Sequence, residues 1–290
     1  MSLHPQFARP RNVDQAVEIL SSLTTGATII AGGQEIMPHI NYGVLAPSVY
    51  VDIGSISALR GVSEADGAVH IGALTVHRDL EDDHLLKGAV PLLAYAASQV
   101  GGGWQVRNRG TVGGNIVSMH PLYDILPSLL ALGAEVDVLS GSGESRVALA
   151  DLMRDTGHGL GSETLLVRVV VKPMTPGVGW AYEKLKISEG GYGSANAAAI
   201  VTMNGDAITD LRVVVGAVTE LPLDVSDALS ECRGQSWSDR LGETIERKTI
   251  GEVTNPLSDH QGDGDWRRAM AGVVARRAVG AAIARTRGDA

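Results

Sequence analysis

Glycine is concentrated at two points of the chain, and this constrains the fold more than any other feature. The segment GGGWQVRNRGTVGGN at 101–115 holds six glycines, and a second pair, Gly32-Gly33, stands in AGGQEIMP at 31–38. The whole chain has 36 glycines in 290 residues, whereas about 7% is usual. Because glycine lets the backbone turn and approach another group closely, we expect 101–115 to be a loop without regular structure.

Both Gly-Gly pairs are flanked by apolar residues, which indicates that each hangs from buried structure. Backbone amides without bulky neighbours suit a pyrophosphate. A single pair is more often a tight turn, but two such pairs together favour joint binding of a diphosphate. The apolar flanks are Ile29, Ile30 and Ile36 for the first pair and Val112, Ile116 and Val117 for the second.

The spacing of apolar residues predicts an α+β protein in three parts, 1–57, 58–176 and 177–290. In the first part, a helix follows the candidate N-cap Asn12. The expected strands of the first two parts are 27–31, 49–53, 67–72, 135–139 and 165–171, and the other expected helices are two within 75–99 and one at 122–132.

The third part is expected to hold three strands within 180–220 and helices at 236–248 and 266–287. The last helix is rich in arginine, and two interpretations stay open: a solvated face or a surface for a partner. Its arginines are Arg267, Arg268, Arg276, Arg277, Arg285 and Arg287.

Composition excludes several classes of function. The net charge of −9 opposes binding to nucleic acid. A single cysteine, Cys232, cannot form an internal disulfide, a Cys-rich zinc site or an iron–sulfur cluster, so redox chemistry here needs an organic cofactor. No run of 18 apolar residues and no leader-like segment occur, so we expect a cytoplasmic protein without a membrane span.

Other nucleotide and hydrolase signatures are absent. No GxGxxG follows a predicted strand, and neither GxxxxGK[ST], GxSxG nor HExxH occurs in the sequence. A Rossmann site, a P-loop, a nucleophile elbow and a zincin site therefore have no support.

Two motifs, AGGQEIMP at 31–38 and VRNRGTVGGNIVSMHPLYDILP at 106–127, resemble those of the FAD-binding, or medium, subunit of molybdenum hydroxylases. The same unit forms the middle domain of xanthine dehydrogenases. The likeness extends over nearly the whole chain. It implies two α/β lobes, 1–57 and 58–176, of the vanillyl-alcohol-oxidase (PCMH) type of FAD-binding fold, and a C-terminal α+β domain, 177–290, like that of carbon monoxide dehydrogenase flavoproteins.

The resemblance also implies which residues bind FAD. By family pattern, two loops wrap the diphosphate with main-chain donors, an aspartate binds polar groups of the cofactor, and a strand offers backbone groups to the flavin or adenine edge. The corresponding residues are Ile30, Ala31, Gly32, Gly33, Gln34, Glu35 and Ile36 in the first loop, Thr111, Gly113, Gly114 and Asn115 in the second, then Asp124, Leu165 and Leu166. From the residues alone, Asp124 is equally a helix cap, and the two leucines are equally strand interior.

Near the isoalloxazine, the family supplies a lysine, which corresponds to Lys184 in YEKL, with Lys186 as the second choice. Relatives often follow this stretch with two arginines and a segment that shields one flavin face. Here the chain reads KISEGGYGSANAAAIV instead, and Tyr192 either takes that shielding position or lies on an exposed turn. Glu35 also replaces the serine usual in bacterial relatives.

The function that the resemblance implies is that of an oxidoreductase subunit, an FAD-containing electron-transfer subunit. It would pass electrons from the [2Fe–2S] clusters of a small subunit to an external acceptor, while a large molybdopterin subunit hydroxylates the substrate, commonly in a dimer of heterotrimers. Two alternatives stay open. One is a stand-alone flavin oxidase of the same fold, and the other is a structural subunit without cofactor.

Overall fold

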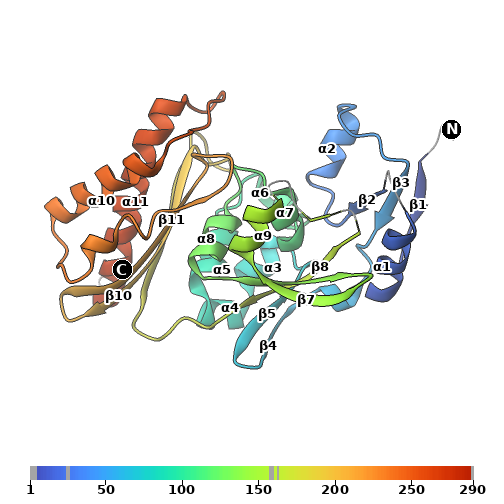
Figure 1. The fold of residues 1–290 in the computed structure, drawn as a ribbon, viewed down its shortest axis with the longest axis horizontal. Coiled ribbons are helices and arrows are strands. Elements are labelled where there is room, and N and C mark those ends of the chain that lie inside the picture. The colour runs from blue at the N-terminus through green and yellow to red at the C-terminus, as the bar shows by residue number, and fades with distance from the viewer. Residues whose placement is uncertain (1–4, 24–26, 157–159, 162, 289–290) are drawn as a thin grey trace.

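Three sheets follow one another along the molecule, each with its own helices (Figure 1). The computed structural model describes residues 5–23, 27–156, 160–161 and 163–288. Each sheet lies within one of the three predicted parts, whose boundaries themselves stay predictions. Among the described residues, no helix is both long and apolar enough to cross a bilayer.

The first sheet has three parallel strands in the order β1 (Gln6–Ala8), β3 (Val49–Asp52) and β2 (Ala27–Ile30). Helix α1 (Val13–Ser22) buries Ala16, Val17 and Leu20, and the side chain of Asn12 caps its first turn by accepting from the amide of Gln15. The predicted helix and strands of this part therefore form. The turn after β2 also continues into a short helix that we did not expect, α2 (Ile36–Asn41).

The second sheet is antiparallel and has five strands, and its helices share one apolar core with it. The strand order is β4 (Val62–Ala65), β5 (Ala68–Gly72), β8 (Leu165–Val171), β6 (Glu135–Ser140) and β7 (Gly143–Ala148). The helices are α3 (His77–Asp82), α4 (His84–Ala89), α5 (Pro91–Ser98), α6 (Gly103–Arg107), α7 (Val112–Ser118), α8 (Ile125–Ala131) and α9 (Leu149–Thr156), with a 3₁₀ turn, η1 (Ser57–Leu59), before β4.

The prediction of an irregular loop at 101–115 was wrong, because α6 and the start of α7 lie within it. In α7, Val112 and Ile116 are fully buried in the core of the second part. Tertiary packing therefore stabilises a helix that contains two glycines, although glycine is a poor helix former. The segment 75–99, where two helices are expected, holds three, α3, α4 and α5.

The third sheet has the antiparallel order β12 (Leu223–Asp224), β11 (Ala207–Gly216), β10 (Ala195–Asn204) and β9 (Gly179–Leu185). On one face it packs against α11 (Gly264–Arg287), with α10 (Asp239–Glu252) beside that helix and a 3₁₀ turn, η2 (Ser230–Cys232), in the connection. On the other face, Tyr182, Ala198 and Val214 pack against α5 and α8. The third part is thus joined to the second by a buried apolar layer.

Candidate functional site

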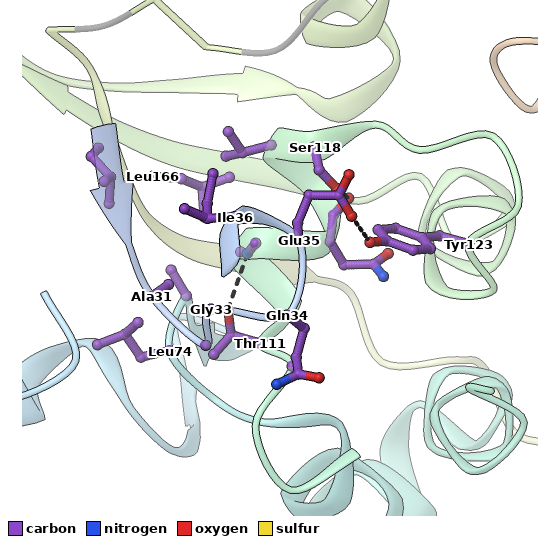
Figure 2. A pocket seen from close by; sticks show the side chains of 18 of the residues that line it. Ala31, Gly33, Gln34, Glu35, Ile36, Leu74, Thr111, Ser118, Tyr123 and Leu166 are labelled. Atoms are coloured by element: carbon purple, nitrogen blue, oxygen red, sulfur yellow. Dashed lines mark hydrogen bonds between the residues drawn. The ribbon is translucent and has the colours of Figure 1, made fainter. Parts of the chain in front are cut away.

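A cavity of about 590 Å³ lies between the first two parts and reaches a loop of the third part (Figure 2). This volume falls within the range of about 300–1,000 Å³ that is typical of small-molecule sites. Both glycine segments line it, as do the amino-terminal turn of α7 and the start of β8. Residues more than 130 positions apart therefore surround one pocket.

The two glycine segments meet in space because their glycines allow backbone to approach backbone. A Cβ atom at Gly32 would lie 2.0 Å from the carbonyl oxygen of Arg109, which precedes the second pair. A Cβ at Gly113 would lie 2.7 Å from the carbonyl oxygen of Ala73. Since real Cβ atoms do not approach so closely, Gly32 is needed where the two lobes meet, and Gly113 is needed for α7 to pack on Ala73 within the second part.

The free backbone donors come from the first loop. In α7, the amide of Gly113 donates to Ala73 O at 2.9 Å, and that of Gly114 donates to Thr111 Oγ1 at 3.1 Å. Among the described residues, by contrast, the amides of Gly33, Gln34 and Glu35 donate to no protein group. The amides of the second pair are thus used within the chain, and the first loop supplies the unpaired N–H groups.

Two buried side chains of the lining keep polar atoms without a protein partner. Asn115 Oδ1 and His77 Nδ1 are both enclosed and unpaired. Burial, together with the nearby Arg107 guanidinium, lowers the pKa of His77 to about 4, so its imidazole is neutral at pH 7. Such unpaired groups cost free energy unless a ligand or water satisfies them, which fits a site for a polar ligand.

Glu35 joins the first loop to the segment 118–124 across the pocket. Its carboxylate accepts a hydrogen bond from the phenol of Tyr123 (Figure 2). Burial and the Glu35 carboxylate raise the pKa of Tyr123, which keeps the phenol a donor. The ring of Tyr123 lies against His120, with centroids 4.8 Å apart, and His120 stacks on Tyr192 at 5.7 Å.

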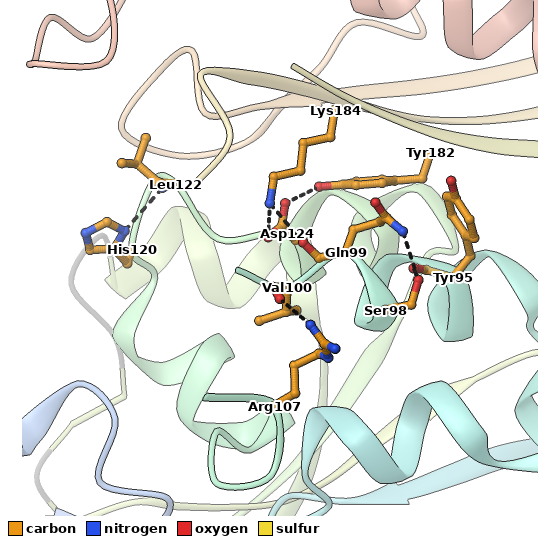
Figure 3. Close-up of polar contacts among 10 residues, drawn as sticks. All are labelled: Tyr95, Ser98, Gln99, Val100, Arg107, His120, Leu122, Asp124, Tyr182 and Lys184. Carbon is orange, nitrogen blue, oxygen red and sulfur yellow. Dashed lines mark hydrogen bonds and ion pairs between the residues drawn. The ribbon is translucent and has the colours of Figure 1, made fainter. Parts of the chain in front are cut away.

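Asp124 is held by two side chains of the third part (Figure 3). Its Oδ2 lies 2.8 Å from Lys184 Nζ, and its Oδ1 accepts a hydrogen bond of 2.7 Å from Tyr182. Lys184 also donates to Gln99 O at 2.9 Å. Burial raises the pKa of Asp124, while the ammonium and the two hydrogen bonds act to lower it.

Asp124 does stand at the N-cap of α8, but its side chain makes no capping hydrogen bond. The alternative of a routine cap is therefore wrong. Its carboxylate instead joins the pocket wall to β9.

The structure brings fourteen of the sixteen predicted site residues to this one pocket, and two lie outside its lining. Ile30 lies within β2, where its carbonyl accepts from the amide of Ile53. Lys184 has an enclosed ammonium that is paired with Asp124, so it does not present a free cation to the pocket. The exposed Lys186 does not line the pocket either.

Two further predictions each left two interpretations open, and in both cases the structure agrees with both interpretations. Leu165 and Leu166 are buried in β8 and also line the pocket. Tyr192 lies on a glycine turn and is 44% exposed, yet it reaches the lining and stacks on His120. Strand interior and exposed turn are therefore compatible with positions at the site.

Sequence reasoning missed His77 and Tyr123, which also line the pocket. Tyr123 stands inside the motif 106–127, so its closeness to Asp124 was a usable signal. His77 follows β5 in ALTVHRD and carries no such signal. Its position depends on the amide of His77 donating to Gly110 O, a contact between segments 33 residues apart.

The arginines of α11 are mostly used within the chain. Arg267 is fully buried, which contradicts its assignment to a solvated face. Arg285 lies over the ring of Trp180 at 3.8 Å, Arg276 lies near Glu246, and Arg268 donates to Val253 O. These contacts hold α11 on its own part of the molecule, so the helix is not a continuous basic surface.

Comparison with known proteins identifies the parts of the chain. The family model for the FAD binding domain in molybdopterin dehydrogenase matches residues 3–173, and that for the CO dehydrogenase flavoprotein C-terminal domain matches 180–282. The carbon monoxide dehydrogenase medium chain of Hydrogenophaga pseudoflava is 32% identical over 287 residues, 97% of each chain. The glyceraldehyde dehydrogenase medium chain of Sulfolobus acidocaldarius is 30% identical over 281 residues, 94% of this chain and 97% of the relative.

A solved structure agrees with these matches over the whole fold. Carbon monoxide dehydrogenase from Hydrogenophaga pseudoflava, in a form that lacks the Mo-pyranopterin moiety, superposes with a TM-score of 0.93 at 30% identity. The superposition covers 98% of this chain and 99% of that chain. The predicted PCMH-type FAD-binding fold with its C-terminal α+β domain is thereby confirmed. The chain belongs to the family of FAD-binding medium subunits of molybdenum hydroxylases, and it is a subunit of an oxidoreductase.

Proposed function

We propose that this chain is the electron-transfer subunit of a heterotrimeric molybdenum hydroxylase. It receives electrons from the [2Fe–2S] clusters of a small subunit and delivers them to an external acceptor, while a large molybdopterin subunit hydroxylates the substrate. FAD, when bound, supplies a group that exchanges electrons singly with a cluster and singly or in pairs with an acceptor. The chain has one cysteine, Cys232, so the iron–sulfur clusters must belong to a partner.

The observation that carries this proposal is the pocket on which both glycine segments converge. The unpaired amides of Gly33, Gln34 and Glu35 suit the diphosphate, as dipoles rather than cations. The buried Asn115 Oδ1 suits a hydroxyl donor of the ribityl chain. Leu165 and Leu166 offer an apolar wall to the ring systems. The donor set therefore fits a dinucleotide.

The third part adds Tyr192 to the pocket lining and supports the lining residue Asp124 from behind. Tyr182 and Lys184 fix the Asp124 carboxylate, so it accepts hydrogen bonds from a ligand in one orientation. We place Tyr192 over one face of the flavin, because its ring lines the mouth of the pocket and is held by stacking on His120.

The assembly that we propose is a dimer of heterotrimers. Relatives over nearly the full length are named medium chains, which implies large and small chains beside them. The identity of the hydroxylated substrate depends on the large subunit.

The test is to express the chain with its two partner subunits and to measure cofactor content and reduction by the substrate. We expect one FAD per chain, reduced only when the iron–sulfur subunit is present. A complex without flavin would establish the structural-subunit alternative. Reduction of the isolated chain's flavin by substrate would establish the stand-alone oxidase.

A further inference from the structure

A buried arginine of the third part holds backbone on two sides of the pocket mouth. Arg267 lies near the start of α11, and none of its surface is exposed. Its Nη2 lies 2.5 Å from Asp259 Oδ1, and its Nε donates to Gly262 O at 3.4 Å. Because a buried cation is costly unless it is paired and hydrogen-bonded, the partners of its remaining nitrogen identify what it holds.

The first of these partners is the loop that carries Tyr192. Arg267 Nη1 donates to Ser194 O at 2.7 Å, two residues after that tyrosine. On the other side of Tyr192, Gly190 O accepts a hydrogen bond of 2.7 Å from the amide of Gly102. The loop 186–194 is therefore fixed at one point by the second part and at another by α11.

The second partner connects Arg267 to the opposite aromatic segment. The same Nη1 donates to Ala217 O, and the amide of Ala217 donates to Pro121 O at 3.2 Å. Ala217 has a φ of 61°, a left-handed conformation that is strained for a residue with a side chain. Such strain persists only where the surroundings hold the backbone, and Arg267 and Pro121 hold this residue from its two sides.

These two backbone segments present the rings that stack at the pocket mouth. Tyr192 lies two residues before Ser194, and His120 lies directly before Pro121; their ring centroids are 5.7 Å apart and their planes are inclined by 26°. We propose that Arg267 is a positioning residue of the site, which sets Tyr192 and the turn of His120 and Tyr123 against each other through the carbonyls of Ser194 and Ala217. This inference rests on the proposed function for the identity of the ligand.

A guanidinium is required because one side chain must serve three carbonyls and a carboxylate at once. Its planar fork presents donors in fixed directions, whereas a lysine ammonium is a single point with flexible geometry. Arg267→Lys therefore keeps the charge beside Asp259 and loses part of the backbone anchoring. This gives a conservative variant beside the more severe Arg267→Met.

The first test measures hydrogen exchange on the full chain. Losing a hydrogen bond to a charged group should speed exchange in 118–124 and 186–194 by about tenfold or more, with Arg267→Met above Arg267→Lys. The amides of Tyr123 and Ser194 are hydrogen-bonded, so their exchange rates report directly on the opening of these two segments. The matched control is Val274→Ala, at a fully buried position on the same helix. It should speed exchange throughout the third part, without a specific increase in 118–124 and 186–194. Equal patterns in Arg267→Lys and Val274→Ala would overturn the proposal.

The second test uses the FAD-loaded complex and records the visible circular dichroism of its flavin. Arg267→Lys and Tyr192→Ala should each change the spectrum, and the double variant should match Tyr192→Ala, because the two residues act in series. Additive changes would overturn the proposed action through Tyr192. A wild-type complex without FAD would refute the proposed function, and the exchange measurement would still decide whether Arg267 positions the mouth.

Discussion

The pocket is built differently on its two sides. Where the first two parts meet, glycine lets backbone pack on backbone, as at Gly32 against Arg109 O. On the side of the third part, buried ionic side chains hold the structure: Lys184 reaches across to Asp124, and Arg267 binds two carbonyls of its own part. The close packing at glycine is disrupted when a side-chain atom is added, and the ionic contacts are disrupted when a charge or a hydrogen-bond donor is removed. The following variants test that distinction.

The largest effect is expected for Gly32→Ala. A Cβ placed 2.0 Å from Arg109 O forces the two lobes apart, and this overpacking should lower the free energy of unfolding by about 4 kcal/mol or more. FAD content should fall with it, measured on the purified complex. The control is Gly88→Ala in α4, where no heavy atom lies within 4 Å of the added Cβ, so stability should be unchanged or slightly raised. Equal stability of the two variants would contradict the close-packing account.

Lys184→Met tests the ionic side. Removing one partner leaves the Asp124 carboxylate buried without its cation, which should lower the free energy of unfolding by about 3 kcal/mol at pH 7. Denaturant unfolding of the full chain measures this loss. Lys186→Met, two residues away and exposed, should change stability by less than about 0.5 kcal/mol. Equal losses in both variants would show that the pair is not the cause.

His77 predicts a pH dependence on the glycine side. Its pKa is about 4 in the folded chain and about 6.5 in the unfolded chain, so the unfolded state binds a proton first as the pH falls. Stability should therefore be full above pH 6.5 and should fall by roughly 2–3 kcal/mol toward pH 4. His77→Asn should remove this part of the pH profile. Parallel profiles for the variant and the wild type would contradict the assignment.

The smallest expected effect is that of Tyr182→Phe. It removes one hydrogen bond to the Asp124 carboxylate and keeps the ring that packs between the second and third parts. Stability should fall by about 1.5 kcal/mol. In a double-mutant cycle with Asp124→Asn, the two losses should not add, because both residues belong to one network. Additive losses would mean that the Tyr182 hydroxyl stabilises the chain independently of Asp124.

Much of the fold follows from local pattern. The capped helix after Asn12, the strand at 165–171 and the three strands after 179 form where the spacing of apolar residues predicts them. Strand β1 and the hairpin strand β7 were not predicted. β1 has three residues, and β7 is mostly exposed, so neither carries a clear apolar pattern.

For the site, the sequence determined the two glycine motifs, and these led to the lining of the pocket. Tertiary structure decided which atoms are free. The amide of Gly114 is used locally by Thr111, the N-cap of its own helix, whereas Gly113 and Lys184 are paired because Ala73 and Asp124 arrive beside them from other segments. A sequence motif specifies residue types and their spacing. Hydrogen-bond partners that come from distant segments depend on packing, and no local pattern encodes them.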